Sequence, residues 1–279
     1  NGYDVWSLSL RGAAPSSQPL SSSLRKLGRF NLEPEVFKTM QKRVADVKMT
    51  DWSVDDHIGY DVPAALRYVR EQTGYEKVHW IGHSMGGMIM FAWLGQGGVE
   101  AAASVKSFVA IAVPMAVFHP LSEPFNFLLD TQPALQIGST IVGSSAPATA
   151  GLIFGDMNTE IDKLFYNGKN VGEDVIRSLF RLAQEEISPG QLSQLLEMVR
   201  NERFHSLDKT INYTARLSSV TTPTYFMVGT VDNMATVGAV QYAYREVAGE
   251  TKRFGLFGRV NGHKNDYGHN DIIIGQNAL

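Results

Sequence analysis

The sequence predicts an α/β fold, a mostly parallel sheet with helices on both faces and a helical cap inserted between two of its strands. Short apolar runs rich in β-branched and aromatic residues alternate with segments of helical periodicity, which is the pattern of a covered parallel sheet. The 279 residues are enough to bury a large core without disulfides. A stretch of about a hundred residues in the second half breaks the alternation, which indicates an insertion.

Five short segments are expected to form the strands of this sheet. Each is apolar, and turn residues follow it. These segments are residues 3–10, 77–82, 105–113, 224–229 and 253–257.

Three segments between these strands have the pattern of helices. Residues 62–73 are preceded by Asp61, the expected N-cap, and followed by Gly74 as the stop. Residues 85–94 continue directly from the second strand, and residues 239–247 link the last two strands. The alternation of strands with helices places these helices on the faces of the sheet.

The insertion is expected over residues 118–221, as a cap or lid between core parts 1–117 and 222–279. Its first portion carries very little charge, whereas its second portion has amphipathic helical periodicity. One predicted helix there opens at Ser188, which has capping-box spacing to Gln191. The apolar positions of the two predicted helices are Val175, Ile176, Leu179, Phe180 and Ala183, and Leu192, Leu195, Leu196 and Val199.

Composition excludes several classes of protein. The formal net charge of −3 gives no electrostatic case for binding nucleic acid. The absence of cysteine excludes disulfides, thiolate metal sites and cysteine nucleophiles, and no cluster of ligands suggests another metal or cofactor. The longest apolar run, residues 108–118, is too short to be a transmembrane helix. No signal peptide is visible, but the chain has no initiator Met, so this absence does not indicate the compartment. The sequence does not indicate an oligomeric state either.

A G-x-S-x-G pattern lies at Gly82-His83-Ser84-Met85-Gly86, where an expected strand runs directly into an expected helix. A serine at so sharp a turn has strained backbone angles. A Cβ two positions before or after it is expected to collide with the turn, and Gly82 and Gly86 have no Cβ. The Met85 N–H at the helix start is suited to stabilising an oxyanion. The alternative interpretation is a surface serine at a glycine-rich corner.

A serine nucleophile needs a base that is oriented by an acid, in the chain order Ser, acid, His. Asp232 follows the strand 224–229 almost directly, and its alternative role is that of a turn or cap residue. Two histidines, His263 and His269, follow the last strand. We expect His269 to be the base, because an apolar run that could begin a helix follows it, whereas His263 lies in a polar loop.

Several of these segments together resemble the α/β-hydrolase superfamily, and within it the lipases and carboxylesterases of acid-lipase type. The resemblance implies a serine hydrolase of esters, with Ser84, Asp232 and His269 as the triad by motif position. It does not extend through residues 118–221. It is carried by Gly2-Tyr3-Asp4-Val5-Trp6, Ser9-Leu10-Arg11-Gly12, Tyr60-Asp61-Val62-Pro63-Ala64, Gly82-His83-Ser84-Met85-Gly86-Gly87 and Tyr267-Gly268-His269-Asn270-Asp271.

The resemblance also implies that parts of the family fold are missing from this sequence. Residues 3–10 resemble the fourth strand of the family, so the third strand, with the first oxyanion donor, would lie between the first two strands here. A final helix would follow His269. We therefore expect an interior portion of a longer protein, truncated at both ends. These residues alone are expected to fold poorly or to be inactive, while the longer parent is active.

The charge-poor stretch after the third strand favours a hydrophobic acyl ester or a lipid ester as substrate. Its apolar side chains either line an acyl pocket or simply pack the cap on the core. The same triad also serves amidases, peptidases, thioesterases and acyltransferases, and a non-catalytic binding protein would be expected to lack one of its members. The candidate pocket residues are Phe125, Phe127, Leu128, Leu135, Ile137 and Ile141.

Overall fold

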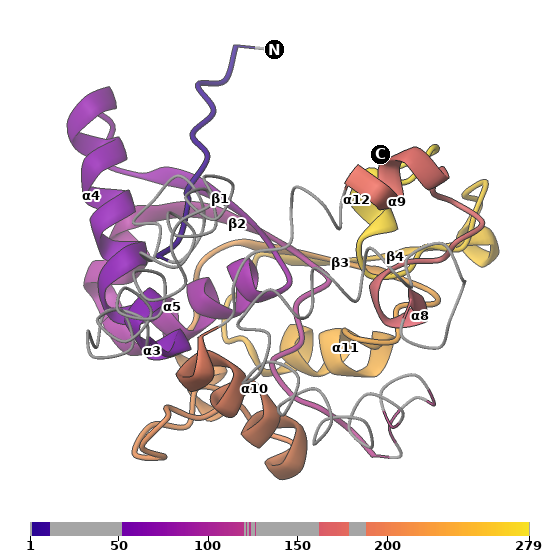
Figure 1. Ribbon diagram of the computed structural model, residues 1–279. Coiled ribbons are helices and arrows are strands. Elements are labelled where there is room, and N and C mark those ends of the chain that lie inside the picture. The colour runs from indigo at the N-terminus through magenta and orange to yellow at the C-terminus, as the bar shows by residue number, and fades with distance from the viewer. Residues whose placement is uncertain are drawn as a thin grey trace, which may run out of the picture.

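The structure, a computed structural model, contains a sheet of four parallel strands in the order β1-β2-β3-β4 (Figure 1). The strands are β1 (Val78–His83), β2 (Val105–Ile111), β3 (Thr224–Gly229) and β4 (Lys252–Phe257). The predicted parallel α/β sheet is therefore confirmed. The residues that the structure describes are 2–11, 52–119, 121, 123, 126, 162–178 and 188–278.

The strands run in the same direction, so their carboxyl ends meet at one edge of the sheet. His83, the last residue of β1, is paired with Ile111, the last residue of β2. Gly229 at the end of β3 is paired with Phe257 at the end of β4. Side chains that follow these strands therefore gather at a single edge, which is where open α/β sheets bind ligands.

Helices α5 (Met85–Ser104) and α11 (Val237–Glu246) lie below the strands in Figure 1. Helix α5 packs on β1 and β2, and α11 packs on β3 and β4. Helix α5 is longer than predicted, because it continues past a break at Gly98, where φ is +53°. Helix α11 lies close to its expected position.

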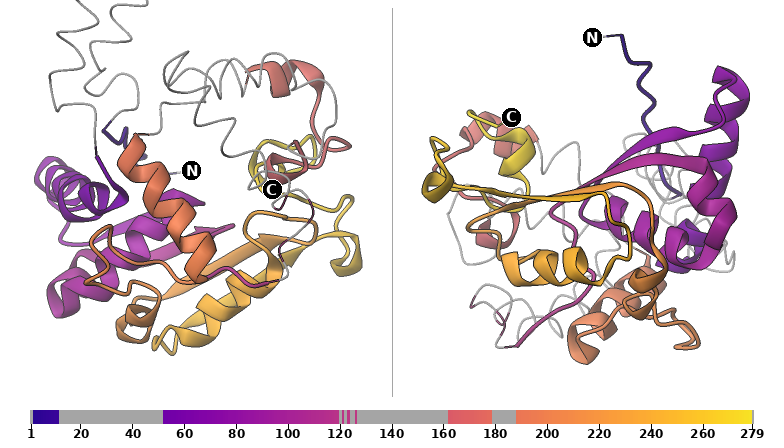
Figure 2. Two further views of the ribbon diagram at one scale, coloured as in Figure 1. Left: turned by 60° about the horizontal axis from the view of Figure 1, so that its bottom comes forward. Right: turned by 180° about the vertical axis from the view of Figure 1, so that it is seen from behind.

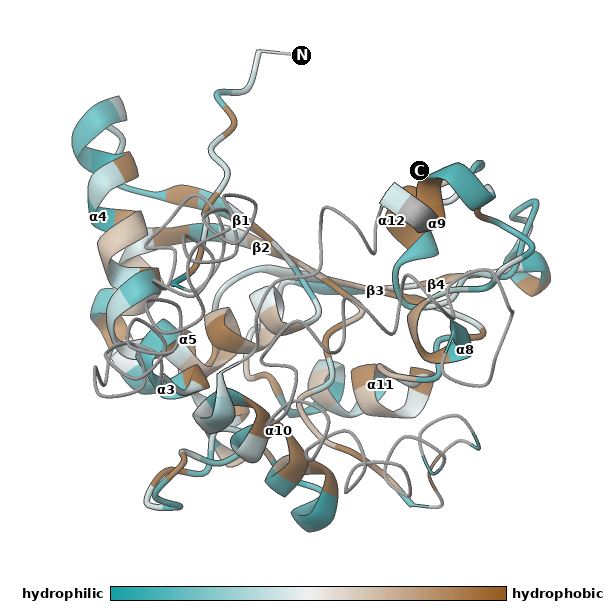
Figure 3. Ribbon diagram, in the orientation of Figure 1, coloured by the Kyte–Doolittle hydropathy of each residue, from teal (hydrophilic) through white to brown (hydrophobic). Residues whose placement is uncertain are grey.

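The core between these layers is built around buried aromatic rings. Phe91 of α5 stacks on Phe226 of β3 with ring centroids 5.4 Å apart, and meets Phe108 of β2 edge-on at 4.7 Å. Figure 3 shows hydrophobic residues along β2 and on α5. Burying large apolar side chains of this kind is the main source of stability for such a layer.

The prediction of a strand over residues 3–10 is wrong. Residues 2–10 have no strand pairing, and Tyr3 and Val5 are 77% and 85% exposed. A strand requires a paired neighbour for its backbone N–H and C=O groups. Within the described residues β1 pairs only with β2, so residues 3–10 have no strand beside them to join.

The prediction that Asp61 caps a helix is also wrong. Helix α3 (Val54–Asp56), a π-helical turn (His57–Asp61) and α4 (Val62–Thr73) follow one another without a break. Asp61 has helical backbone angles inside this run, and its carboxylate accepts a hydrogen bond of 2.7 Å from Arg11 Nη2. Burial opposes ionisation of this carboxyl, but hydrogen bonds from Arg11 and His57 hold the pKa of Asp61 below its ordinary value.

Two other helix ends agree with the sequence. Gly74 ends α4 with φ +73°, a conformation that glycine adopts without strain. Ser188 begins α10 (Pro189–Asn201), and its Oγ accepts the Gln191 N–H at 3.1 Å. The buried face of α10 differs from the prediction, however, because Gln191, Gln194, Met198 and Val199 line it.

Two short helices, α8 (Asp162–Phe165) and α9 (Glu173–Ser178), are described in the middle of the insertion. Ile176 of α9 is buried as expected, but Val175 is exposed. Leu179, Phe180 and Ala183 lie outside the described residues.

The end of the insertion packs into the main core. Phe204 and Leu217 are fully buried there, and the 3-10 turn Ala215–Ser219 lies against α5. The division into 1–117, 118–221 and 222–279 stays a prediction. In the ranges that the structure covers, no helix combines the length and apolar character needed to cross a bilayer.

Candidate active site

Ser84 sits on a tight turn between β1 and α5. Its φ of +49° and ψ of −122° are unfavourable for any residue with a Cβ. The Ser84 N–H donates to the Ile111 carbonyl at 2.9 Å, and the Ser84 carbonyl accepts from Gly87 and Met88 in the first turn of α5. The turn therefore holds the Ser84 hydroxyl at the carboxyl edge of the sheet, at the N-terminus of a helix.

Two glycines allow this turn to close, but only one of them is a glycine expected from the sequence. A Cβ at Gly82 would lie 2.6 Å from the Gly86 carbonyl oxygen. A Cβ at Gly87 would overlap the Val113 side chain. The steric reason predicted for Gly86 is wrong, because a Cβ there meets no atom within 4 Å. The sequence has glycine at both 86 and 87. Packing against the Val113 side chain requires glycine at the second of these positions.

The difference in space around Gly82 and Gly86 predicts different outcomes for the same substitution at the two positions. Gly82→Ala is expected to destabilise the protein by about 1–3 kcal/mol and to lower activity, because the turn must shift to admit the Cβ. Gly86→Ala is expected to leave both nearly unchanged. Urea unfolding and ester hydrolysis of the two variants check this, and equal losses in both would contradict it.

The structure brings Ser84, His269 and Asp232 together. His269 Nε2 lies 2.8 Å from Ser84 Oγ, and His269 Nδ1 lies 3.0 Å from Asp232 Oδ2. His269 and Asp232 are only 2% and 5% exposed. His263, the other candidate, lies elsewhere, with its ring 4.9 Å from that of Phe257.

Asp232 is itself held by the backbone that follows it. Its Oδ1 accepts the N–H groups of Met234 at 2.9 Å and Ala235 at 2.8 Å. A carboxylate can only accept hydrogen bonds, so the His269 nitrogen facing it carries the proton. The other nitrogen of His269 then presents its lone pair to the Ser84 hydroxyl.

The loops that carry Asp232 and His269 are joined by a close backbone approach. The Val231 N–H donates to the Tyr267 carbonyl at 3.0 Å. A Cβ at Gly229 would overlap that same carbonyl. Glycine at the end of β3 therefore lets the two loops come together.

His83 supports His269 from the side of β1. Its Nε2 donates to the His269 carbonyl oxygen at 2.9 Å, and the two ring centroids are 4.8 Å apart. Burial, with a smaller contribution from the charge of His269, lowers the pKa of His83 to about 4. His83 is therefore neutral at neutral pH.

The lowered pKa of His83 predicts a stability that falls in mild acid. The unfolded chain binds a proton at this histidine below pH ~6.5, whereas the folded chain does not until about pH 4. Stability from this group is thus fully present above pH ~6.5 and falls by about 3 kcal/mol as the pH drops toward 4. Urea unfolding at several pH values should show a shallower decline for His83→Gln. The same slope in both proteins would contradict the prediction, and His119→Gln, at an exposed position, is the control.

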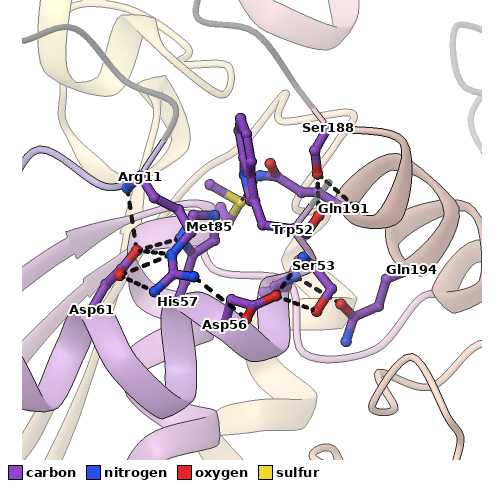
Figure 4. A network of polar contacts seen from close by, with 11 residues as sticks. Arg11, Trp52, Ser53, Asp56, His57, Asp61, Met85, Ser188, Gln191 and Gln194 are labelled. Atoms are coloured by element: carbon purple, nitrogen blue, oxygen red, sulfur yellow. Dashed lines mark hydrogen bonds and ion pairs between the residues drawn. The ribbon is translucent and has the colours of Figure 1, made fainter. Parts of the chain in front are cut away.

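Met85 is the first residue of α5, and the first N–H groups of a helix have no partner within it. Its side chain meets α10, where Gln191 Nε2 donates to Met85 Sδ at 2.8 Å (Figure 4). The Ser188 Oγ of the same helix donates to the Trp52 carbonyl. Sequence reasoning predicted the start of α10 but not this contact, because nothing local to Gln191 indicates a partner about a hundred positions away.

The proposed acyl-pocket residues cannot be placed in the same way. Phe125, Phe127, Leu128, Leu135, Ile137 and Ile141 all lie outside the described residues. In the part of the chain that is described, no group of three or more His, Asp or Glu side chains is arranged to hold a metal ion.

Comparison with curated proteins finds similarity to lipases. The chain is 31% identical to lipase lipl-1 of Caenorhabditis elegans over 118 residues, which is 42% of this chain and 24% of that protein. It is 30% identical to the gastric triacylglycerol lipase of Mus musculus over 125 residues, 45% of this chain and 26% of the lipase. A longer match, to triacylglycerol lipase 2 of Arabidopsis thaliana, is 23% identical and covers 99% of this chain and 66% of that lipase. The first two matches thus span about a quarter of their relatives.

A solved structure and a family model were also compared with the chain, and the family model gives the broader relationship. The chain is similar to a monoacylglycerol lipase from Paleococcus ferrophilus with a TM-score of 0.48 and 13% identity, covering 81% of this chain and 70% of the other. A family model described as the alpha/beta hydrolase fold matches residues 1–273. The chain therefore belongs to the α/β-hydrolase fold family.

Proposed function

We propose that this protein hydrolyses carboxylic esters by way of an acyl-enzyme on Ser84, with His269 as the base and Asp232 as the orienting acid. The observation that carries the proposal is the relay of two contacts, 2.8 Å from Ser84 Oγ to His269 Nε2 and 3.0 Å from His269 Nδ1 to Asp232 Oδ2. A serine hydroxyl becomes nucleophilic when a base positioned in this way accepts its proton.

The reaction proceeds in two halves. Ser84 Oγ attacks the ester carbonyl carbon while its proton passes to His269 Nε2, and the carbonyl oxygen takes the negative charge. When the tetrahedral intermediate collapses, the C–O bond to the alcohol breaks and His269 returns the proton to the leaving oxygen. Water then attacks the acyl-enzyme with His269 as base again, releasing the acid and regenerating Ser84.

The negatively charged oxygen of the tetrahedral intermediate, the oxyanion, needs further stabilisation. The Met85 N–H lies at the N-terminus of α5, directly after the nucleophile, so both its hydrogen and the helix dipole favour negative charge there. This backbone N–H is proposed as one donor. Each such donor contributes on the order of 10²–10³-fold in rate.

The proposed substrate is an ester with a hydrophobic acyl group, or a lipid ester. Relatives described as triacylglycerol lipases support this choice. The low charge of residues 111–155, a stretch that begins at the last residue of β2, agrees with it. The proposed acyl pocket comprises Phe125, Phe127, Leu128, Leu135, Ile137 and Ile141.

A fluorophosphonate probe tests the nucleophile without knowledge of the natural ester. In the full-length protein we expect a covalent adduct on the tryptic peptide that contains Ser84, located by mass spectrometry. Hydrolysis of p-nitrophenyl esters from acetate to octanoate then tests the acyl site. No adduct at Ser84 would contradict the mechanism, and a sharp preference for acetate would contradict a long acyl pocket.

A further inference from the structure

A polar cluster outside the triad lies beside the loop that carries His269. Its members are Asn167 and Asn170 from the insertion, and Asp266 and Asp271 from the His269 loop. We call these four residues the loop clamp. Asn167 and Asn170 lie between α8 and α9, and Asp271 is the first residue of α12 (Asp271–Ile274). Figures 1 and 2 show these three helices close together near the ends of β3 and β4.

Asp271 is the centre of the loop clamp. Its side chain is fully buried, yet no lysine or arginine is among its hydrogen-bond donors in the described part of the chain. Its Oδ1 accepts the N–H groups of Asn167 at 2.9 Å and Gly268 at 3.0 Å, and its Oδ2 accepts from Asn170 Nδ2 at 2.7 Å. Burial raises the pKa of Asp271, although these hydrogen bonds oppose the rise. A buried carboxylate held only by N–H groups fixes the geometry of everything that donates to it.

The two asparagines hold the other side of the same loop. Asn170 Nδ2 also donates to the Asp266 carbonyl at 2.6 Å, and Asn167 Nδ2 donates to that carbonyl at 2.8 Å. Residues on both sides of His269 are therefore bound to the insertion. The backbone adds a further link, because the Asn270 N–H donates to the Phe165 carbonyl at 2.8 Å.

The same part of the insertion also reaches the Asp232 loop. Asn233 Nδ2 donates to the Lys163 carbonyl at 3.1 Å. Residues 162–171 thus bind next to Asp232 as well as around His269. Movement of this segment would therefore displace both loops.

We infer that Asp271 and Asn170 are positioning residues, which hold the His269 imidazole in register with Ser84 through the loop clamp. The inference rests on the proposed function, because it gives these residues a role only if His269 is the base. It follows from the contacts above together with the sensitivity of catalysis to geometry, where a displacement of about 1 Å costs about 10²-fold. Neither residue touches the reacting atoms.

Asp271→Asn in the full-length protein is the sharpest test. The amide nitrogen must face one of the N–H donors whichever way the side chain turns, so one contact of the loop clamp becomes repulsive. We expect kcat for p-nitrophenyl butyrate and the rate of fluorophosphonate labelling to fall about 10–100-fold, with KM changed less than about twofold. Asp174→Asn, the same chemical change at an exposed position of α9, is the control and should match the parent protein.

A second variant weakens the loop clamp from the side of the insertion. Asn170→Ala removes the amide that donates both to Asp271 Oδ2 and to the Asp266 carbonyl. We expect kcat to fall about 10–100-fold here too, with KM changed less than about twofold. A purely structural loss would lower the folded fraction instead, and circular dichroism measures that directly. If Asp271→Asn does not fold, Asn170→Ala alone carries the test, with the same expected loss in kcat.

The outcomes separate this inference from the proposed function. Parent protein that reacts with the probe, together with folded Asp271→Asn that reacts within twofold of it, overturns the loop clamp alone. A parent protein that never labels at Ser84 overturns the proposed function and this inference with it. A loss in kcat in folded Asp271→Asn and in folded Asn170→Ala, with KM nearly unchanged, supports both.

Discussion

Ser84→Ala is expected to lower kcat for ester hydrolysis on the order of 10⁴–10⁶-fold, because no other group in the relay can form the acyl-enzyme. Labelling by the fluorophosphonate probe should disappear with it. Binding of substrate, as far as KM reflects it, should change little.

The same substitution should hardly affect folding. Alanine and serine are equally strained at φ +49°, and the Ser84 backbone hydrogen bonds remain. We therefore expect the free energy of unfolding to stay within about 0.5 kcal/mol. Ser218→Ala, at an exposed position, is the control and should retain full activity. Activity of Ser84→Ala above about a tenth of the parent's would rule out this nucleophile.

The residues of the relay could be predicted because each carries a local signal. Ser84 lies at a strand-to-helix junction flanked by glycine, and Asp232 directly follows a strand. Parallel strands bring such positions to one edge of the sheet, so chain order placed the base after the last strand. The apolar run that follows His269 then favoured it over His263. The structure places all three within hydrogen-bond reach in that arrangement.

What the sequence could not predict depends on partners that are distant along the chain. The apolar segment 3–10 has the composition of a strand, but pairing needs a neighbour that its own composition cannot supply. Asp61 precedes an expected helix and so resembles a cap, yet Arg11, 50 positions away, takes its carboxylate.

The loop clamp was missed for the same reason. Asn170 and Asp271 are 101 positions apart, and neither belongs to a pattern that indicates the other. In the Tyr267-Gly268-His269-Asn270-Asp271 motif, only the histidine was assigned a role from the sequence. The structure shows that Asp271 of the same motif is fully buried. Polar residues that support a site from behind leave no periodicity or spacing in the sequence.

Asp232→Asn is expected to lower kcat about 10⁴-fold while the protein stays folded. The reason lies in the two backbone N–H groups, of Met234 and Ala235, that Asp232 Oδ1 accepts. An asparagine at this position keeps its oxygen toward these donors and so turns its NH₂ toward His269 Nδ1. That nitrogen must then accept, which moves the imidazole proton to Nε2.

In this tautomer His269 donates toward Ser84 and cannot take its proton, so the nucleophile is not activated although every heavy atom keeps its place. Steady-state hydrolysis of p-nitrophenyl butyrate measures the loss, and urea unfolding verifies that the fold is intact. Asp208→Asn, the same change in an exposed turn, should leave kcat within about twofold of the parent. A folded Asp232→Asn protein with kcat within about tenfold of the parent would mean that Asp232 does not set the tautomer of His269, and the relay would then reduce to Ser84 and His269 alone.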